Sequence, residues 1–394
     1  MRAVVRVGMR AVVRVGMRAV VIGGGVAGSA SAIALARVGF EVTVYEAYED
    51  PAGPVGSYVS LAVNGLRALA ALGCLEQVQE AGFPVARQLM WSGRGKMLGD
   101  VARGRSPEDT LHSVTLMRAD LVTALREEAW RSGARIVTGQ RLAGSREEVA
   151  EGADLIVGAD GIWSATRREL DPAAPQPVYA KIYYISGISD GTRIRTEISR
   201  QGFNWIFAKR GVFIYLPAPD GSIWWTAQVA AAQPPPDPAA VSVTDLAELF
   251  RTEPQAEAVL RAATGVRTAN IGHVLAPVSR RYRGTIVLIG DAAHPVGAGQ
   301  GASMAMEDAV VLARELAAAD SIPAGLAAFD RQRHPRSGKL AKTETANRDA
   351  KTAGPITTRM REMIMPLVFN RFYEKATSWL YEYDPGSLPA RQPR

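Results

Sequence analysis

Cysteine and histidine are scarce in this chain. Its 394 residues include one cysteine, Cys74, and four histidines. A single cysteine excludes an internal disulfide framework and agrees with a reducing cytoplasm, which is the location we expect. The histidines lack metal-ligand spacing and there is no Cys/His cluster, so we expect no metal site. The mostly apolar neighbours of Cys74 predict a buried structural thiol rather than a reactive one.

Long apolar runs and two common catalytic motifs are also missing. No stretch reaches the roughly 18 apolar residues of a membrane-spanning helix, so we expect no membrane span. Neither a G-x-S-x-G nucleophile turn nor a P-loop occurs. These two absences argue against a hydrolase built on that serine turn and against a P-loop nucleotide triphosphatase.

A strong charge imbalance is absent once an N-terminal repeat is set aside. Residues 1–8 and 9–16 both read MRAVVRVG, and residues 17–24 read MRAVVIGG. Without the two copies, which hold four arginines, the formal charge falls from +7 to +3. The nearly balanced body gives no reason to expect nucleic-acid binding. We interpret residues 1–16 as a duplicated extension and not as a signal peptide, because arginines interrupt its apolar stretch.

Short apolar, β-branched runs alternate with helical patterns along much of the chain. Residues 17–22 and 41–46 predict two strands around a helix, and residues 154–159 and 285–290 predict two more strands. From about residue 178 to 230 the pattern becomes alternating and aromatic, which is typical of antiparallel strands. The sequence therefore predicts an α/β fold with two different sheets.

The predicted fold has a discontinuous Rossmann-type dinucleotide-binding domain, a mainly antiparallel β-sheet substrate domain and C-terminal helices. We expect the first domain in residues 17–85, 105–177 and 266–345. The second would hold residues 86–104 and 178–265, and the C-terminal helical segment residues 346–394.

A glycine-rich turn follows the first predicted strand, with Gly23, Gly25 and Gly28 spaced as G-x-G-x-x-G. The first glycine permits a tight turn, the second lets a pyrophosphate approach the backbone, and the third lets helix and strand pack closely. The helix N-terminus then offers N–H groups and partial positive charge to phosphates. Glu46 lies 18 residues after Gly28, near the offset of a ribose-binding carboxylate. The pattern predicts dinucleotide binding but does not separate FAD from NAD; a structural glycine turn is the alternative.

Two further motifs follow in a fixed order. Asp160-Gly161 occurs in VGADGIWSATRREL, and Gly290-Asp291 occurs in VLIGDAAHPVGAGQGASMAMEDA. Together with the glycine turn they resemble the FAD-dependent aromatic hydroxylases, which are single-component (group A) flavoprotein monooxygenases. The resemblance extends from Met17 to the tail and implies that the dinucleotide is FAD.

The resemblance also implies roles for individual residues. Asp291 would bind the ribityl chain, and the helix that begins near Gly301 would direct its positive end at the flavin ring. Asp160 would bridge FAD and NAD(P)H contacts, and a helix-capping role is its alternative. Arg118 would lie near the flavin phosphates, with a surface arginine at a helix start as its alternative. The expected cofactor-binding set is Gly23, Gly25, Ala27, Gly28, Glu46, Ala47, Arg118, Asp160, Asp291, Gly301, Ala302 and Ser303.

One loop departs from the family pattern. The family usually has a proline between GDAAH and GQG, whereas this chain reads GDAAH-PVGA-GQG, which is shorter, with Pro295 directly after His294. The resemblance puts this loop where flavin, oxygen and substrate meet, so the shortening affects the details of oxygen activation. His294 is the catalytic candidate, as a general base; a fixed hydrogen-bonding loop residue is the alternative.

Aromatic side chains are frequent on the alternating strands. On one face they would line a pocket for a flat apolar substrate, and the alternative is plain sheet packing. Alternation places about half of them on each face. The expected pocket residues are Trp205, Phe207, Phe213, Tyr215 and Trp225, together with Pro295.

The resemblance implies an oxidoreductase in which NADPH or NADH reduces FAD. O2 would then form a C4a-(hydro)peroxyflavin that passes one oxygen atom to a small aromatic or polycyclic molecule. We expect a role in secondary metabolism, such as antibiotic biosynthesis, and a monomer or homodimer. The alternatives are a flavin-dependent reductase or dehydrogenase of the same fold, and an FAD-bound protein that sequesters a reactive intermediate without oxygenase turnover.

Overall fold

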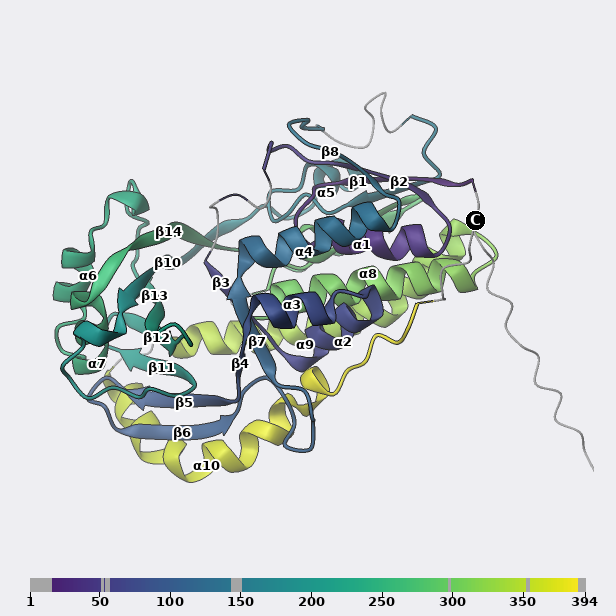
Figure 1. The fold of residues 1–394 in the computed structure, drawn as a ribbon. Helices are drawn as coiled ribbons and strands as arrows, with labels where there is room; N and C mark the ends of the chain where they lie inside the picture. Colours follow the sequence, from purple (N-terminus) through teal and green to yellow (C-terminus); the bar gives the residue numbers. More distant parts are fainter. Residues whose placement is uncertain are drawn as a thin grey trace, which may run out of the picture.

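The computed structural model describes residues 16–50, 53, 57–142, 151–296, 299–351 and 355–388. A parallel sheet with helices forms one end of the molecule, and a second, curved sheet forms the other (Figure 1). The predicted α/β fold is therefore confirmed. The predicted duplication of residues 1–16 lies outside the described residues, except for Gly16. Within the described part of the chain, no helix has the length and hydropathy of a membrane span.

The first sheet has six strands in the order β15-β16-β9-β1-β2-β8. All neighbours are parallel except β15 and β16. Its central strands are buried on both faces, which explains why their sequences are continuous apolar runs. The strands are β1 (Arg18–Ile22), β2 (Glu41–Tyr45), β8 (Arg135–Val137), β9 (Leu155–Gly158), β15 (Tyr282–Arg283) and β16 (Ile286–Leu288).

Helices around this sheet enclose the largest apolar core. Ala30, Ala32 and Ala34 of the first helix are fully buried, and these small side chains let neighbouring helices approach closely. Cys74 is buried in the same core, and its burial raises the pKa of the thiol to about 12, as expected for a structural cysteine. Helices α1 (Val26–Arg37), α2 (Val63–Leu72), α3 (Leu75–Ala81), α4 (Arg118–Arg131) and α8 (Gly301–Ala318) contribute to this core. Helix α5 (Ala165–Leu170) packs against β16 in a separate apolar cluster.

The second sheet has seven strands in the order β14-β10-β13-β12-β11-β5-β6, antiparallel except between β11 and β5. Two short helices, α6 (Val243–Leu249) and α7 (Pro254–Arg261), pack on its outer face. The predicted domain limit between residues 265 and 266 falls inside β14, and the domain limits stay a prediction. The strands are β5 (Arg87–Ser92), β6 (Met97–Ala102), β10 (Val178–Asp190), β11 (Phe203–Ala208), β12 (Gly211–Pro217), β13 (Ser222–Ala230) and β14 (Ala263–Val274).

Small elements connect the two sheets. A three-stranded sheet has the order β3-β7-β4, with β3 (Tyr58–Leu61), β4 (Phe83–Val85) and β7 (Ser113–Met117). Single 3₁₀ turns occur at η2 (Gly191–Arg193), η3 (Pro238–Ala240) and η4 (Gly290–Ala292).

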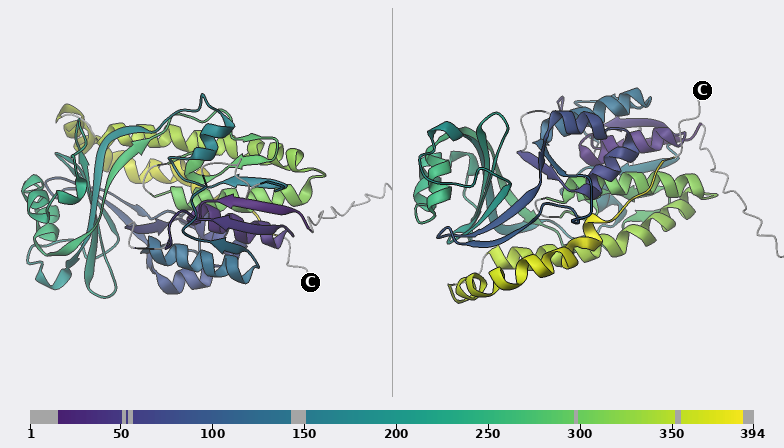
Figure 2. Two further views of the ribbon diagram at one scale, coloured as in Figure 1. Left: turned by 90° about the horizontal axis from the view of Figure 1, so that it is seen from above. Right: turned by 60° about the horizontal axis from the view of Figure 1, so that its bottom comes forward.

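The last two helices of the described chain are long: α9 (Ile322–Lys351) and α10 (Pro355–Tyr381). Figures 1 and 2 show α10 running along the second sheet beside β6. Asn370 Oδ1 accepts a hydrogen bond from the Asp100 backbone N–H at 3.0 Å. Lys96 Nζ donates to the Glu362 carbonyl, also at 3.0 Å. The C-terminal helices therefore link the edge of the second sheet to the helices around the first.

Candidate functional site

The three sequence motifs meet at one edge of the first sheet. The turn at Gly23 follows β1, Glu46 follows β2, Asp160 follows β9, and Gly290 follows β16. Because these strands are parallel, their carboxyl ends lie at the same edge, where α/β proteins bind ligands. A Cβ on Gly290 would lie 2.9 Å from Ala27 Cβ, so the late motif packs directly on α1.

The glycine turn has the geometry that its spacing predicts. Gly23 has a φ of +103°, a conformation that side chains disfavour, and a Cβ there would overlap the carbonyl of Ala159. A Cβ on Gly28 would overlap the carbonyl oxygen of Gly23. Gly25 is different, because its Cβ would meet only Arg118 Nη2, at 3.7 Å. The space in front of Gly25 is therefore open, as a bound pyrophosphate requires.

The start of α1 fits the phosphates of FAD. Gly25 is its N-cap, no side chain caps it, and its first turn has no acidic residue. The first N–H groups of a helix have no intrahelical partner, and uncapped they form an anion site. The start of α8 has the same character, because Gln300 is its N-cap, without a capping hydrogen bond, and its first turn has no acidic residue.

Glu46 is buried beside the glycine turn. Its Oε2 accepts a hydrogen bond from Gly24 N–H at 2.6 Å, and its Oε1 accepts one from Tyr48 N–H at 2.9 Å. A carboxylate has about four acceptor positions, so capacity remains for ribose hydroxyls. Ala47, the next residue, is half-buried.

The charges of Arg118 and Asp291 attract each other at this site. Burial lowers the pKa of Arg118, while Asp291 and Glu46 act in the opposite direction. The surrounding protein shields the Asp291 carboxyl from water and so raises its pKa, while the charges of His294 and Arg118 lower it. Asp291 Oδ1 lies 3.6 Å from the Cβ position of Gly301, which joins the late motif to the start of α8.

The side chain of Asp160 is engaged at the start of α5. Its carboxylate accepts hydrogen bonds from Ser164 Oγ at 2.5 Å and from Thr166 N and Oγ1, both at 3.0 Å. This arrangement corresponds to the helix-capping alternative. The fully buried Arg167 donates to the Ala292 carbonyl at 3.0 Å and to the Ile162 carbonyl at 2.6 Å. Arg167 thus ties the middle motif to the late one.

His294 pairs with a carboxylate on α8. Its Nε2 lies 2.6 Å from Asp308 Oδ2, which also accepts Gly290 N–H at 3.0 Å. Asp308 Oδ1 accepts Arg333 Nε at 2.7 Å. Burial by itself would raise the pKa of Asp308, but His294 and Arg333 hold it well below its usual range. Among the described residues, the other ring nitrogen of His294, the buried Nδ1, has no hydrogen-bond partner.

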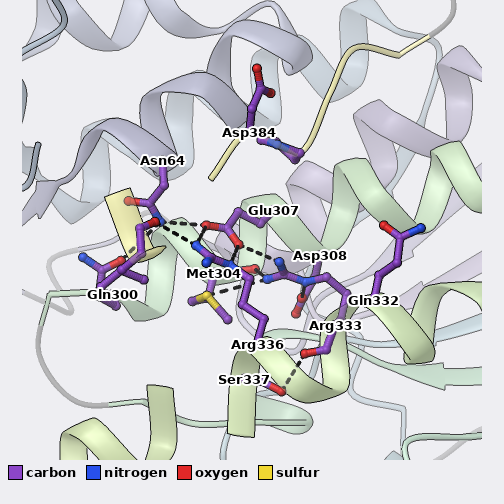
Figure 3. A network of polar contacts seen from close by, with 12 residues as sticks. Asn64, Gln300, Met304, Glu307, Asp308, Gln332, Arg333, Arg336, Ser337 and Asp384 are labelled. Atoms are coloured by element: carbon purple, nitrogen blue, oxygen red, sulfur yellow. Dashed lines mark hydrogen bonds and ion pairs between the residues drawn. The ribbon is translucent and has the colours of Figure 1, made fainter. Parts of the chain in front are cut away.

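Figure 3 shows a buried polar network that the sequence interpretation missed. Glu307 is fully buried, and its Oε2 accepts Arg333 Nη1 at 2.6 Å and Arg336 Nε at 2.7 Å. Its Oε1 accepts Asn64 Nδ2 at 2.7 Å, and Asn64 also reaches Gln300 Oε1 at 3.3 Å. The available signal was the pair Glu307-Asp308 within an otherwise uncharged stretch of α8, residues 301–313, which requires buried cations elsewhere.

The same network holds the C-terminal segment. Arg336 Nη1 and Nη2 donate to the Trp379 and Leu380 carbonyls, each at 2.9 Å. The Arg336 guanidinium also lies 3.9 Å from the ring centre of Tyr383. Glu307 therefore connects two parts of the molecule. Through Asn64 it reaches Gln300, the residue before α8, and through Arg336 it reaches the last turn of α10.

A first cavity of about 420 Å³ opens at the start of α8. Gly301 and Ala302 line it on one side, and the inner face of the second sheet lines it on the other. Ser303 is turned away, with its Oγ against Gly65 of α2. The polar side chains from the sheet are Tyr184, Ser186, Thr226, Gln228, Thr268, Asn270 and His273.

The predicted aromatic pocket is corrected by the sheet's alternation. Trp205 does line the first cavity. Phe213, Tyr215 and Trp225 are fully buried on the opposite face, in a core with α6 and α7. Phe207 packs beside another apolar cluster of the sheet and is not in the wall of either cavity described here. Since side chains alternate along a strand, Ile214 and Thr226, which are next to these buried aromatics, face the cavity in their place.

A second cavity of about 730 Å³ lies beyond the His294–Val296 segment, against α9. Tyr184, His273 and Val296 line both cavities. Pro295, expected in the substrate pocket, lines this second cavity, as do His294 and Asp291. Gly297 and Ala298, in the shortened loop, lie outside the described residues. Over the described chain, no group of three or more His, Cys, Asp or Glu side chains has the arrangement of a metal site.

Comparison with known proteins agrees with this geometry. A family model described as "FAD binding domain" matches residues 17–344. A kynurenine 3-monooxygenase from Salinispora arenicola is 31% identical over 361 residues, which cover 83% of this chain and 78% of the relative. An aurachin C monooxygenase/isomerase from Stigmatella aurantiaca is 28% identical over 345 residues, 80% of this chain and 85% of the relative.

The fold also matches a solved structure. The structure of Klebsiella pneumoniae HpxO complexed with FAD and uric acid superposes with a TM-score of 0.77. The match covers 92% of this chain and 95% of that one, at 23% sequence identity. The family resemblance predicted from the three motifs is thus confirmed. The chain belongs to the FAD binding domain family and is an FAD-dependent monooxygenase of aromatic or heterocyclic substrates.

Proposed function

We propose that the enzyme oxygenates a small, neutral or anionic aromatic compound that binds in the first cavity. The observation that carries this proposal is the composition of the cavity wall beside the start of α8. Its lining side chains include aromatics, amides, hydroxyls and Arg103, but no Asp or Glu. A wall of this kind suits a flat ring that carries hydroxyl, amine or carboxylate groups.

Arg103 is the cation best placed to select an anion. Its guanidinium carbon lies 4.0 Å from the ring centre of Phe203, and Nη1 donates to Gln88 Oε1 at 2.5 Å. In the described part of the chain no carboxylate pairs with it, and its buried Nε has no hydrogen-bond partner. A substrate carboxylate would supply Arg103 with both a counter-charge and an acceptor for its Nε, in a charge-assisted hydrogen bond.

Other polar groups in the wall suit substrate hydroxyl or amine groups. Gln228 is buried, and its Oε1 has no partner among the described residues, so a substrate N–H or O–H would supply one. Burial raises the pKa of Tyr58 to about 12, although a hydrogen bond with Thr226 opposes the shift. The Tyr58 hydroxyl therefore stays neutral and can donate.

FAD would be held at the edge where the three motifs meet, and when bound it supplies the redox chemistry with O2 and NAD(P)H. We assign the diphosphate to the start of α1 and Arg118, a ribose to Glu46, and the ribityl chain to Asp291. The uncapped start of α8 would stabilise negative charge on the ring. For Asp160, the observed capping contacts support a structural role.

His294 is better suited to positioning than to acting on the substrate. It lines the second cavity and not the first, and Asp308 fixes its ring. This supports the alternative of a fixed hydrogen-bonding loop residue. A role in secondary metabolism is the remaining part of the proposal.

The test is anaerobic reduction of the FAD-loaded enzyme by NADPH in the presence of single aromatic compounds. We would mix it with hydroxybenzoates, aminobenzoates and their amide and cationic analogues, and follow the loss of oxidised-flavin absorbance. Neutral and anionic compounds should accelerate reduction and then yield oxygenated product in air. Reduction that no compound accelerates, or hydrogen peroxide release without product, would favour the reductase alternative.

Replacement of Arg103 tests the charge selection directly. Arg103→Met should weaken binding of a carboxylate substrate about tenfold or more, and binding of its amide analogue much less, because one charge-assisted contact is lost. Arg87→Gln, which breaks an exposed pair with Asp100 outside the cavity wall, is the control. Equal losses for acid and amide would contradict the role of Arg103.

A further inference from the structure

The second cavity differs from the first in its charge. One side is formed by α9 residues from His334 to Lys342, and the other by β10, β14 and the segment that follows β14. Its basic side chains are Arg281, Lys339 and Lys342, together with histidines, and Asp291 is the only carboxylate among its lining residues. A cavity with this balance suits an anionic ligand.

Lys339 and Lys342 place two cations at the rim. They lie three residues apart, so they project from the same side of α9. Both are exposed, and Lys339 Nζ lies 4.1 Å from the ring centre of Trp379. Neither lysine has a carboxylate partner within the described residues. Deeper in the wall, the buried Arg281 donates to Ser337 Oγ at 2.6 Å.

A buried ring nitrogen lies in the wall of the same cavity. The His294 side chain is 6% exposed, and its Nε2 lies 2.6 Å from Asp308 Oδ2. Its Nδ1 has no hydrogen-bond partner in the described part of the chain, so a polar group of a ligand would satisfy it. A carboxamide offers both a donor and an acceptor to such a nitrogen, and phosphates supply the anions for the lysines.

The position of the cavity fits a third reactant. The His294–Val296 segment and the shared side chains Tyr184 and His273 separate it from the first cavity. A ligand here would approach the His294–Val296 segment from the side opposite the first cavity. The volume of about 730 Å³ also lies within the usual range of cofactor-sized pockets.

We propose that the second cavity is the docking site of the nicotinamide dinucleotide, with its phosphates at Lys339 and Lys342 and its carboxamide toward His294. This inference rests on the proposed function only in requiring a dinucleotide reductant. Because NADPH carries one more phosphate than NADH, the two lysines would favour NADPH.

A calorimetric titration of the oxidised, FAD-loaded enzyme with NADP⁺ measures the binding constant and tests the proposal without turnover. The variants are Lys342→Gln and Lys339→Gln/Lys342→Gln. Each lost charge-assisted contact should raise the Kd for NADP⁺ about tenfold, and the Kd for NAD⁺ less. Lys209→Gln, an exposed lysine at the turn after β11 and outside both cavity walls, should change neither constant.

Two measurements keep this test separate from the proposed oxygenase activity. FAD content and the Kd of the aromatic substrate should be unchanged in the single variant Lys342→Gln. An NADP⁺ affinity within about twofold of wild type in the double variant would overturn the proposal, and so would a loss of aromatic-substrate affinity in place of NADP⁺ affinity. Lysine-dependent NADP⁺ binding without any oxygenated product would instead refute the proposed function and leave this site standing.

Discussion

At the scale of single residues, Gly28 is the position that tolerates a side chain least. A Cβ there would overlap the Gly23 carbonyl oxygen, and neither backbone can move without opening the turn between β1 and α1. Gly28→Ala should therefore lower FAD occupancy of the purified protein about tenfold or more, because the diphosphate site loses its shape.

The matched control is Gly265→Ala in β14. Nothing lies within 4 Å of a Cβ at Gly265, and its φ is not positive. This variant should keep wild-type FAD content, measured as the ratio of flavin to protein absorbance. Full FAD occupancy in Gly28→Ala would contradict the role given to the turn.

Residue-level prediction from the sequence succeeded where the backbone conformation dictates the residue type. Gly23 and Gly28 are examples, since only glycine fits their surroundings. It failed for Phe213 and Trp225, because an alternating pattern does not reveal which face meets the cavity and which meets α6 and α7. The cavity residues Thr226 and Gln228 carry no recognisable motif, and only the pairing of β13 with its neighbours identifies them.

At the scale of elements, Glu307 joins α8 to α9 and to the end of α10. Glu307→Gln would leave Arg333 and Arg336 buried with one carboxylate fewer. Loss of one partner from a buried ion pair costs about 3–5 kcal/mol, and we expect the free energy of unfolding in denaturant to fall by that amount.

Glu248→Gln serves as the control for that measurement. It removes a carboxylate from the exposed pair with Arg251, where both side chains are 65% accessible. Such pairs contribute about 1 kcal/mol or less. A loss from Glu307→Gln no larger than the loss from Glu248→Gln would show that the network does not stabilise the helix packing.

Asp308 makes the stability of the packing between α8 and α9 depend on pH. Its pKa is depressed in the folded protein by His294 and Arg333, against a usual value of about 3.9. Its contribution to stability is therefore complete above about pH 4 and is lost as pH falls further. Asp308→Asn should be less stable than wild type at neutral pH but lose less stability as the pH falls below about 4. Parallel stability–pH curves for the two proteins would contradict this assignment.

At the scale of the whole molecule, the chain builds one site from distant segments. The first sheet takes strands from residues 18–22 to 286–288, while the second sheet takes strands from between them. The sequence predicted this interleaving, since glycine-bearing apolar runs and alternating runs follow one another. It did not predict that α10 would run along β6, because the contacts depend on Asn370 and Gly99 meeting across the fold.

The central claim is that FAD binds where the three motifs converge, between the two cavities. The crystal structure of the FAD-loaded enzyme tests this most directly. The account predicts the diphosphate at Gly25 and the start of α1, and the flavin ring beside Gly301 with the first cavity at one side. A flavin bound elsewhere, or density for FAD without contact to Asp291 and the start of α8, would contradict it.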